Sequence, residues 1–250
     1  PTNHGAAIEV RMPNAELVRL GSRSGEAWGP DLVGLFVGSE GMFGIATEIT
    51  LRLEPLPAAV RTLLAAFPSI RAASEAVSGI IAAGIVPAAM EMMDQACVRA
   101  VEASIYAAGY PADAAAVLLV EVDGSAEATE AEAALVESLL LRHRATEVRT
   151  ATTAAERARL WQGRKKAFGA MGRISPDLAV QDAVVPRSTL PDILDRVAAI
   201  AAHYRLGVAN VFHAGDGNLH PNISFDGGDP DQVRRVHAAN HDIMHACLAV

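Results

Sequence analysis

The sequence is organised around one stretch near its end, Val211-Phe212-His213-Ala214-Gly215-Asp216-Gly217-Asn218-Leu219-His220-Pro221-Asn222. The central Gly-Asp-Gly-Asn is typical of a turn, because glycine adopts positive φ at little cost and Asp and Asn hydrogen-bond to nearby backbone. Apolar residues flank the turn on both sides, which predicts a β-hairpin. With residues 215–218 as the loop, Ala214 lies opposite Leu219 and His213 lies opposite His220.

Two histidines opposite each other on a hairpin are candidate metal ligands. Residues directly opposite on antiparallel strands share a face, with Cβ atoms about 4.5–5.5 Å apart. Two imidazoles at that separation can bind one metal ion such as zinc or iron. Asp216 and Asn218 add polar groups at the loop. The spacing leaves one alternative open, an ordinary hairpin with two hydrogen-bonded histidines.

The composition excludes several classes of protein. The chain has 250 residues, enough for one large domain or two small ones, and 51% of them are hydrophobic. No run approaches the ~20 apolar residues of a membrane span, and a net charge of −8 argues against a nucleic-acid surface. The two cysteines, Cys97 and Cys247, are too few for a disulfide scaffold and favour a reducing, cytoplasmic setting. Because the chain begins with Pro1 and not Met, we expect a piece of a longer protein.

Residues 1–56 are predicted to be mostly β-structure. Alternation over residues 7–12, a turn and a returning strand over 17–20 predict a hairpin, and a looser Gly/Ser segment covers 21–30. Three glycines within seven residues, Gly38, Gly41 and Gly44, precede a strand expected at 49–53. Such glycines let the backbone approach a ligand closely and aim its N–H groups at it. A glycine-rich turn between two strands is the alternative.

The character of the sequence changes after Pro55-Leu56-Pro57, a candidate domain boundary. Beyond it we expect strands at 60–67, 117–122, 146–150 and 178–185. The expected helices cover 69–84, 94–109, 125–143, a segment from 153, 188–204 and 229–250. The segment from 153 carries Trp161, Arg164, Lys165 and Lys166. Ser69, Asp94 and Ser125 are the expected N-caps, and Thr153 with Glu156 is expected to form a capping box. This order predicts an α+β domain, a sheet with helices packed against it.

Two motifs carry a resemblance to a known family. Residues 38–48, Gly-Ser-Glu-Gly-Met-Phe-Gly-Ile-Ala-Thr-Glu, resemble the Gly-Ser-Glu-Gly-Thr-Leu-Gly-Ile-Val-Thr-Glu signature of FAD-linked oxidases of the vanillyl-alcohol oxidase type. Residues 213–221, His-Ala-Gly-Asp-Gly-Asn-Leu-His-Pro, resemble a second signature, that of the branch that oxidises 2-hydroxyacids. Residues 91–94 and 163–168 are especially similar to the flavin subunit of bacterial glycolate oxidase, and the branch also contains D-lactate dehydrogenase.

The resemblance implies two domains. Residues 1–56 are expected to be the C-terminal part of an FAD-binding domain and mostly β. Residues 57–250 are expected to be the substrate-side cap domain, with a largely antiparallel sheet and helices packed on it. The resemblance also implies that FAD lies along the first motif, at Gly38, Ser39, Glu40, Gly41, Met42, Phe43, Gly44, Ile45 and Ala46.

The same resemblance implies an activity and its residues. His213 and His220 match two family histidines that hold a divalent metal (Zn, Fe or Mn), and Arg164 matches an arginine that pairs with the substrate carboxylate. For Arg164 the alternative is a surface charge beside Lys165 and Lys166. The implied reaction is oxidation of a small 2-hydroxyacid, glycolate or D-lactate, to the 2-oxoacid, with hydride transfer to flavin and the metal orienting the substrate.

Parts of the family pattern are expected outside this chain. These are the first FAD subdomain and a Gly-Glu-His-Gly segment with a third metal ligand and a base, so the cap domain is expected to be incomplete at its C-terminus and the piece alone inactive. The resemblance also implies partner oxidase subunits, including an iron–sulfur subunit. Two other interpretations stay open, a metal-dependent hydrolase with His213, His220 and Asp216 as ligands and a non-catalytic binding module.

Overall fold

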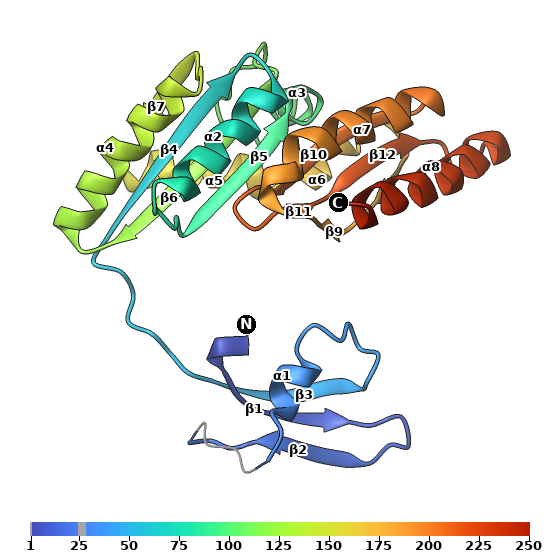
Figure 1. Cartoon of the computed structure of the whole chain (residues 1–250). Coiled ribbons are helices and arrows are strands. Elements are labelled where there is room, and N and C mark those ends of the chain that lie inside the picture. Colours follow the sequence, from blue (N-terminus) through green and yellow to red (C-terminus); the bar gives the residue numbers. More distant parts are fainter. Residues whose placement is uncertain (1, 25–28) are drawn as a thin grey trace. The chain divides into compact units, whose positions relative to one another are not determined.

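The chain divides into two compact units, Pro1–Leu56 and Pro57–Val250 (Figure 1). The computed structural model describes residues 2–24 and 29–250. Part of the Gly/Ser segment expected at 21–30, namely residues 25–28, therefore lies outside the described residues. No helix in the described part of the chain is long and apolar enough to cross a membrane.

The first unit is a small three-stranded sheet with one short helix. Its strands lie in the order β2-β1-β3, and its elements are a 3₁₀ turn (Thr2–His4), β1 (Gly5–Arg11), β2 (Leu17–Gly21), α1 (Leu32–Phe36) and β3 (Ile45–Leu51). The predicted hairpin is confirmed as β1 and β2. The third strand begins at Ile45, four residues before the expected start at 49, because it already pairs with Arg11 there.

The second unit is built on a nine-stranded antiparallel sheet. The order is β7-β4-β6-β5-β10-β11-β9, and β12 pairs with both β10 and β8. The strands are β4 (Ala59–Phe67), β5 (Ala89–Asp94), β6 (Ala116–Gly124), β7 (Glu147–Thr150), β8 (Asp177–Val180), β9 (Ala183–Val184), β10 (Gly207–His213), β11 (Asn218–Leu219) and β12 (Pro221–Phe225). Every recorded pairing in this sheet is antiparallel. The prediction of an α+β fold with a largely antiparallel sheet is confirmed.

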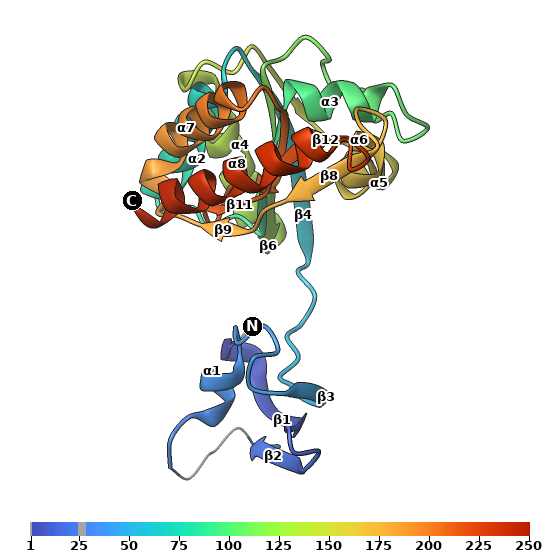
Figure 2. The same ribbon diagram turned by 90° about the vertical axis from the view of Figure 1, so that its right-hand side faces the viewer.

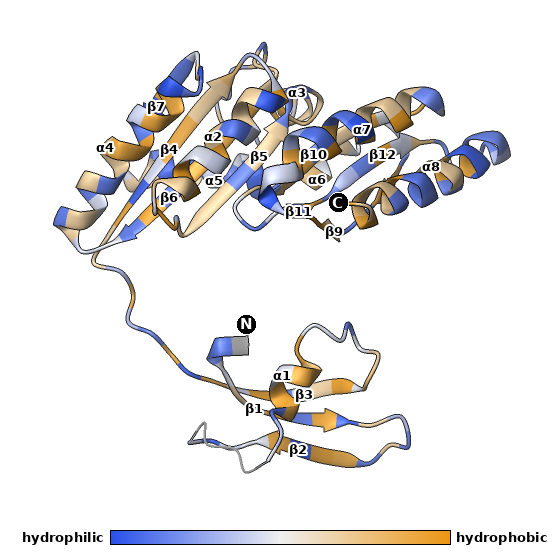
Figure 3. Cartoon of the chain, viewed as in Figure 1, coloured by the Kyte–Doolittle hydropathy of each residue, from blue (hydrophilic) through white to orange (hydrophobic). Residues whose placement is uncertain are grey.

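Helices cover both faces of this sheet, as Figure 2 shows with the sheet nearly edge-on. One core lies under α2 (Ile70–Ala82), α4 (Ala126–Arg142), α7 (Leu190–His203) and α8 (Pro230–Leu248). The second core lies under α3 (Gln95–Glu102), α5 (Ala154–Lys165) and α6 (Ala167–Met171). Central strands buried on both faces need no polar alternation, which explains the continuous apolar run that begins β6. Figure 3 shows hydrophilic and hydrophobic segments alternating along α4, α7 and α8, as in amphipathic helices.

Five predicted helix starts are confirmed, whereas the helix expected from residue 188 begins at Leu190, after a 3₁₀ turn over Arg187–Thr189. One predicted helix end and one predicted strand are also wrong. Ser69, Asp94 and Ser125 accept the expected N-cap hydrogen bonds, and the Thr153 capping box is present. The helix expected to reach residue 109 ends at Glu102, because the Glu102 carboxylate accepts hydrogen bonds from the backbone N–H groups of residues 108, 109 and 110. The strand expected at 178–185 is broken after Val180, because the chain changes its partner there from β12 to β11.

Candidate functional site

The histidine hairpin forms as predicted, with a different register. In the structure His213 of β10 pairs with Asn218 of β11, so residues 214–217 make the turn. The predicted pairing of His213 with His220 and of Ala214 with Leu219 is therefore wrong by two residues. Because side chains alternate along a strand, a shift of two residues keeps both histidines on the same face. Their ring centroids are 5.4 Å apart, with the rings nearly perpendicular at 82°.

Contacts on both sides of the turn fix its register. Gly217 has φ +74°, and its carbonyl accepts a hydrogen bond of 3.0 Å from the N–H of Val185. A Cβ atom at residue 217 would lie 2.2 Å from the Val185 carbonyl oxygen, so only glycine fits. The N–H of Gly215 donates to the carbonyl of Met90, 3.2 Å away. The turn is thus held between β9 and the strand that carries Met90.

Both histidines present the same ring nitrogen to a ligand. His213 Nδ1 lies 2.8 Å from Glu91 Oε1, and His220 Nδ1 lies 3.3 Å from the backbone oxygen of Gln181. A carboxylate and a carbonyl can only accept, so each Nδ1 carries the proton, and each neutral ring keeps its lone pair on Nε2. Neither Nε2 has a hydrogen bond to any residue in the described ranges. Metal-binding histidines in proteins typically have this arrangement, in which a second group holds the other nitrogen.

Arg164 is buried, so the alternative interpretation of this residue as a surface charge beside Lys165 and Lys166 is wrong. Its side chain is 9% exposed, whereas its neighbours Lys165 and Lys166 are exposed. Arg164 Nε and Nη2 lie 2.9 and 2.8 Å from Glu91 Oε2. One buried carboxylate therefore bridges the predicted substrate arginine and the predicted metal ligand His213.

Helix α5, which carries Arg164, lies unusually close to the loop after α3. The reason is Gly163, where a Cβ atom would lie 2.7 Å from Tyr110 Oη and 2.8 Å from Ala108 Cβ. Tyr110 donates a hydrogen bond to the carbonyl of Leu160, one turn earlier in the helix. Burial raises the pKa of this tyrosine, which keeps its hydroxyl a donor. Together these contacts hold α5, and with it Arg164, against the loop after α3.

Buried amide oxygens surround the histidine pair. Asn222 donates to the carbonyls of Ala209 (3.0 Å) and His220 (2.6 Å) and so supports the hairpin. Its Oδ1, Asn218 Oδ1 and Gln181 Oε1 are buried and have no hydrogen-bond partner among residues 2–24 and 29–250. Such oxygens need donors. Phe168 adds an aromatic edge, with its ring centroid 6.3 Å from that of His220.

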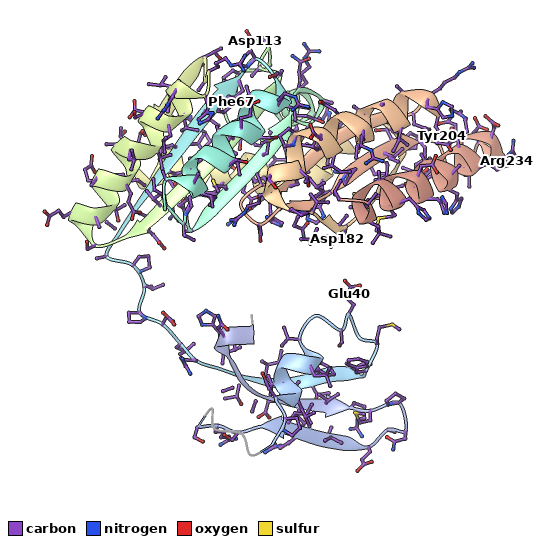
Figure 4. All side chains as sticks on the ribbon, in the orientation of Figure 1. Glu40, Phe67, Asp113, Asp182, Tyr204 and Arg234 are labelled. Atoms are coloured by element: carbon purple, nitrogen blue, oxygen red, sulfur yellow. The ribbon has the colours of Figure 1, made fainter. Side chains whose placement is uncertain are left out.

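The described residues bring together two side chains that could bind a metal, His213 and His220. They contain no group of three or more His, Cys, Asp or Glu side chains that could hold an ion. Asp216, the third ligand of the hydrolase interpretation, is an exposed residue of the turn that does not join the two histidines. Asp182, labelled in Figure 4, has a carboxylate oxygen 3.7 Å from His220 Nδ1. Because this contact is with Nδ1, Asp182 does not lie beside the Nε2 atom that could bind a metal.

Sequence reasoning missed Glu91 as a site residue. It stands in β5 between Met90 and Met92, and it is 8% exposed. A lone carboxylate in an apolar run is the available signal, because buried carboxylates are almost always paired. The sequence does not reveal the partners, since Arg164 and His213 are 73 and 122 residues away.

The glycine-rich motif of the first unit forms an exposed loop after α1. Gly38 and Gly41 have φ values of +86° and +81°, with open space where a Cβ atom would lie. Gly44 is different, because a Cβ atom there would lie 2.7 Å from Val10 Cγ1 of β1. In Figure 4 the side chain of Glu40 points away from this unit. The backbone N–H groups of Glu40, Gly41 and Phe43 have no recorded partner in the described ranges, so they can meet a ligand.

The fold and these motifs place the chain in one class of protein. The family model described as "FAD linked oxidases, C-terminal domain" matches residues 56–250, and the chain belongs to this family. Among its relatives, the glycolate oxidase subunit GlcD of Escherichia coli (strain K12) is 47% identical over 243 residues, which cover 97% of this chain and 48% of that protein. The mitochondrial D-lactate dehydrogenase [cytochrome] of Arabidopsis thaliana is 30% identical over 247 residues, covering 98% of this chain and 43% of that protein.

These curated relatives are about twice as long as the chain, which spans about half of their length. A solved structure of p-cresol methylhydroxylase with substrate bound is similar with a TM-score of 0.75 and 14% identity, covering 98% of this chain and 55% of that one. Alkyldihydroxyacetonephosphate synthase is similar with a TM-score of 0.70 and 14% identity, covering 98% and 48%. At this identity the two structures support the fold alone.

Proposed function

We propose that the chain is the substrate-side part of an FAD-dependent enzyme that oxidises a small 2-hydroxyacid to the 2-oxoacid. The observation that carries the proposal is the pair His213 and His220, each with a free Nε2 on one sheet face, beside the buried Arg164. The names of the relatives, a glycolate oxidase subunit and a D-lactate dehydrogenase, support glycolate and D-lactate as candidate substrates.

In this proposal each group has a separate task. His213 and His220 would hold a divalent metal, Zn, Fe or Mn, through Nε2, and the metal would supply a Lewis acid that orients the substrate. Arg164 pairs with the substrate carboxylate through Nη1, because Nε and Nη2 already face Glu91. When bound, FAD would supply the hydride acceptor for the hydroxyl-bearing carbon, and a base would have to take the hydroxyl proton to give the 2-oxoacid.

The proposal extends to the rest of the parent protein. The first unit serves as the C-terminal part of an FAD-binding domain, and its loop from Gly38 to Ala46 contacts the flavin through open backbone N–H groups. In this proposal the enzyme works in the cytoplasm together with further oxidase subunits, one of them an iron–sulfur protein. The name of the Escherichia coli relative, a glycolate oxidase subunit, supports the presence of further subunits.

The test uses the full-length protein under anaerobic conditions. Its visible absorption is recorded before and after addition of D-lactate or glycolate. An oxidised-flavin band that bleaches with one of the acids is the expected result, and the faster acid identifies the preferred substrate. A protein that stays colourless with added FAD, or a flavin band that neither acid bleaches, contradicts the proposal.

A matched pair of variants tests the role of Arg164. Arg157 lies two helical turns earlier on α5 and pairs with both oxygens of Glu121, away from the histidines; its side chain is 45% exposed, compared with 9% for Arg164. Lysine keeps the charge and loses the fork of donors. We expect Arg164→Lys to raise the KM for the acid at least tenfold and Arg157→Lys to leave it unchanged. Equal KM values in both variants would remove Arg164 from the substrate site.

A further inference from the structure

Within residues 2–24 and 29–250, Glu91 is the one side chain with recorded hydrogen bonds to both a predicted metal ligand and the predicted substrate arginine. It lies in β5, directly opposite His213 of β10 in the antiparallel register. Its two oxygens have different partners. Oε1 lies 2.8 Å from His213 Nδ1, and Oε2 lies 2.9 and 2.8 Å from Arg164 Nε and Nη2.

The contact with Oε1 selects one tautomer of His213. An ionised carboxylate has no proton to give, so the histidine must donate from Nδ1 and keep its lone pair on Nε2. A ring without this partner is free to carry its proton on either nitrogen and to rotate. The side chain of His213 is 44% exposed, compared with 15% for His220, so packing alone holds it poorly.

The contact with Oε2 orients Arg164. Both guanidinium N–H groups on one edge are directed at the same oxygen, which fixes the plane of the group. For the third nitrogen, Nη1, the structure records no hydrogen bond within its described ranges. A single buried carboxylate therefore determines which donor of the arginine and which nitrogen of the histidine are available.

A second arginine–glutamate pair on α5 shows how such a pair attaches the helix to the sheet without contacting a histidine. Glu121 of β6 accepts two hydrogen bonds of 2.8 Å from Arg157, one on each oxygen, and its Oε2 also accepts hydrogen bonds from Thr62 and Trp161. This pair also links α5 to the sheet, yet it contacts no histidine. The contact that Glu91 makes with His213 is thus additional to the docking of the helix.

We infer that Glu91 is a positioning residue, which sets the tautomer of His213 and the orientation of Arg164 together. The inference rests on the proposed function for the identity of the ligands that the two groups receive. It needs no contact between Glu91 and substrate, metal or flavin. In Glu91→Gln one of the two acceptor oxygens becomes an NH2 donor. With its oxygen on Arg164 the amide can only donate to His213 Nδ1, which moves the ring proton of His213 to Nε2; with its NH2 group on Arg164 two donors face each other.

The first test reads the tautomer directly, without metal, substrate or flavin turnover. Nitrogen-15 NMR of the histidine rings at pH 8, in the full-length protein, distinguishes a proton on Nδ1 from a proton on Nε2. We expect the Nδ1–H form for His213 in the wild type and in the control Glu121→Gln, and a mixed or Nε2–H form in Glu91→Gln. An unchanged His213 signal in Glu91→Gln overturns the inference.

The second test measures zinc affinity by competition with a chromophoric chelator. Loss of the partner of a metal-binding histidine typically weakens binding about 10–100-fold. We expect a weakening of that size in Glu91→Gln and less than twofold in Glu121→Gln. Equal weakening in both variants would mean that Glu91 only docks α5, and would overturn the inference. If Glu91→Gln does not fold, Glu91→Asp replaces it, because a carboxylate shortened by one methylene cannot reach both partners.

Failure of the proposed function and failure of the inference about Glu91 would give different results. A wild type that binds no zinc at His213 and His220 contradicts the metal in the proposed function, while the NMR result still decides the role of Glu91. A wild type that binds zinc and oxidises 2-hydroxyacids, together with a Glu91→Gln variant that has unchanged tautomer and affinity, contradicts the inference alone.

Discussion

Gly163→Ala should loosen the helix that carries Arg164. The added methyl group would lie 2.7 Å from Tyr110 Oη, 2.8 Å from Ala108 Cβ and 2.9 Å from Tyr110 Cε2, all of which are closer than ordinary contacts. Overpacking of this kind costs about 1–3 kcal/mol. Alanine is about 1 kcal/mol better than glycine in a helix interior and offsets part of that cost. The net expectation is a loss of about 0–2 kcal/mol in the free energy of unfolding, by the same magnitudes.

The assay is thermal unfolding followed by circular dichroism. In a domain of this size 1 kcal/mol corresponds to about 2–4 °C, so the expected drop in Tm is up to about 8 °C. Gly169→Ala in α6 is the control, because a Cβ atom there has no neighbour within 4 Å. It should leave Tm unchanged or raise it slightly. A Tm for Gly163→Ala that equals that of the control would refute the argument from close approach.

Three further predictions concern the hairpin, a buried carboxylate and a loop. Gly217→Ala should destabilise the protein and weaken zinc binding, because the φ of +74° and the nearby carbonyl of Val185 exclude a side chain. Gly215→Ala is the control: the added Cβ atom would lie 3.4 Å from its nearest neighbour, so stability and zinc affinity should change little. Burial raises the pKa of Glu121, but hydrogen bonds from its neighbours outweigh this effect and leave the pKa below its usual range. The free energy of unfolding, measured with urea, should therefore fall as the pH drops below about 4.5, and it should fall less steeply in Glu121→Gln. Equal slopes in the two proteins would contradict a lowered pKa of Glu121. Glu102→Gln should speed hydrogen exchange at the amides of residues 108–110, and unchanged rates would show that the carboxylate does not hold the loop.

Local chemistry made most of the second unit predictable from the sequence. The N-caps at Ser69, Asp94 and Ser125 and the box at Thr153 place four helix starts within a residue, because capping depends on a side chain and the backbone N–H groups two or three residues later. The end of α3 was not predictable in this way. It depends on the Glu102 carboxylate, which reaches six to eight residues along the chain.

The candidate site was predictable in part for the same reason. The two histidines lie seven residues apart on one hairpin, and alternation keeps them on one face even though the register differs by two residues. Whether Arg164 is buried, and what it pairs with, depends on tertiary packing between α5 and β5. No local pattern carries that information, so Glu91 became a site residue only in the folded structure.

The pairing of β5 with β10 has a consequence for synthesis. The carboxylate and the histidine that it contacts are separated by 122 residues, so at about 5–20 residues per second the ribosome needs roughly 6–25 s to make the second after the first. Once β6 (Ala116–Gly124) has been made, β5 can pair with it on one side, but the other edge of this methionine-rich strand has no partner until β10 emerges. Unpaired apolar edges of this kind are sites of aggregation. The nascent chain is thus most vulnerable along the strand that later completes the site, and chaperone dependence should decrease once β10 has emerged.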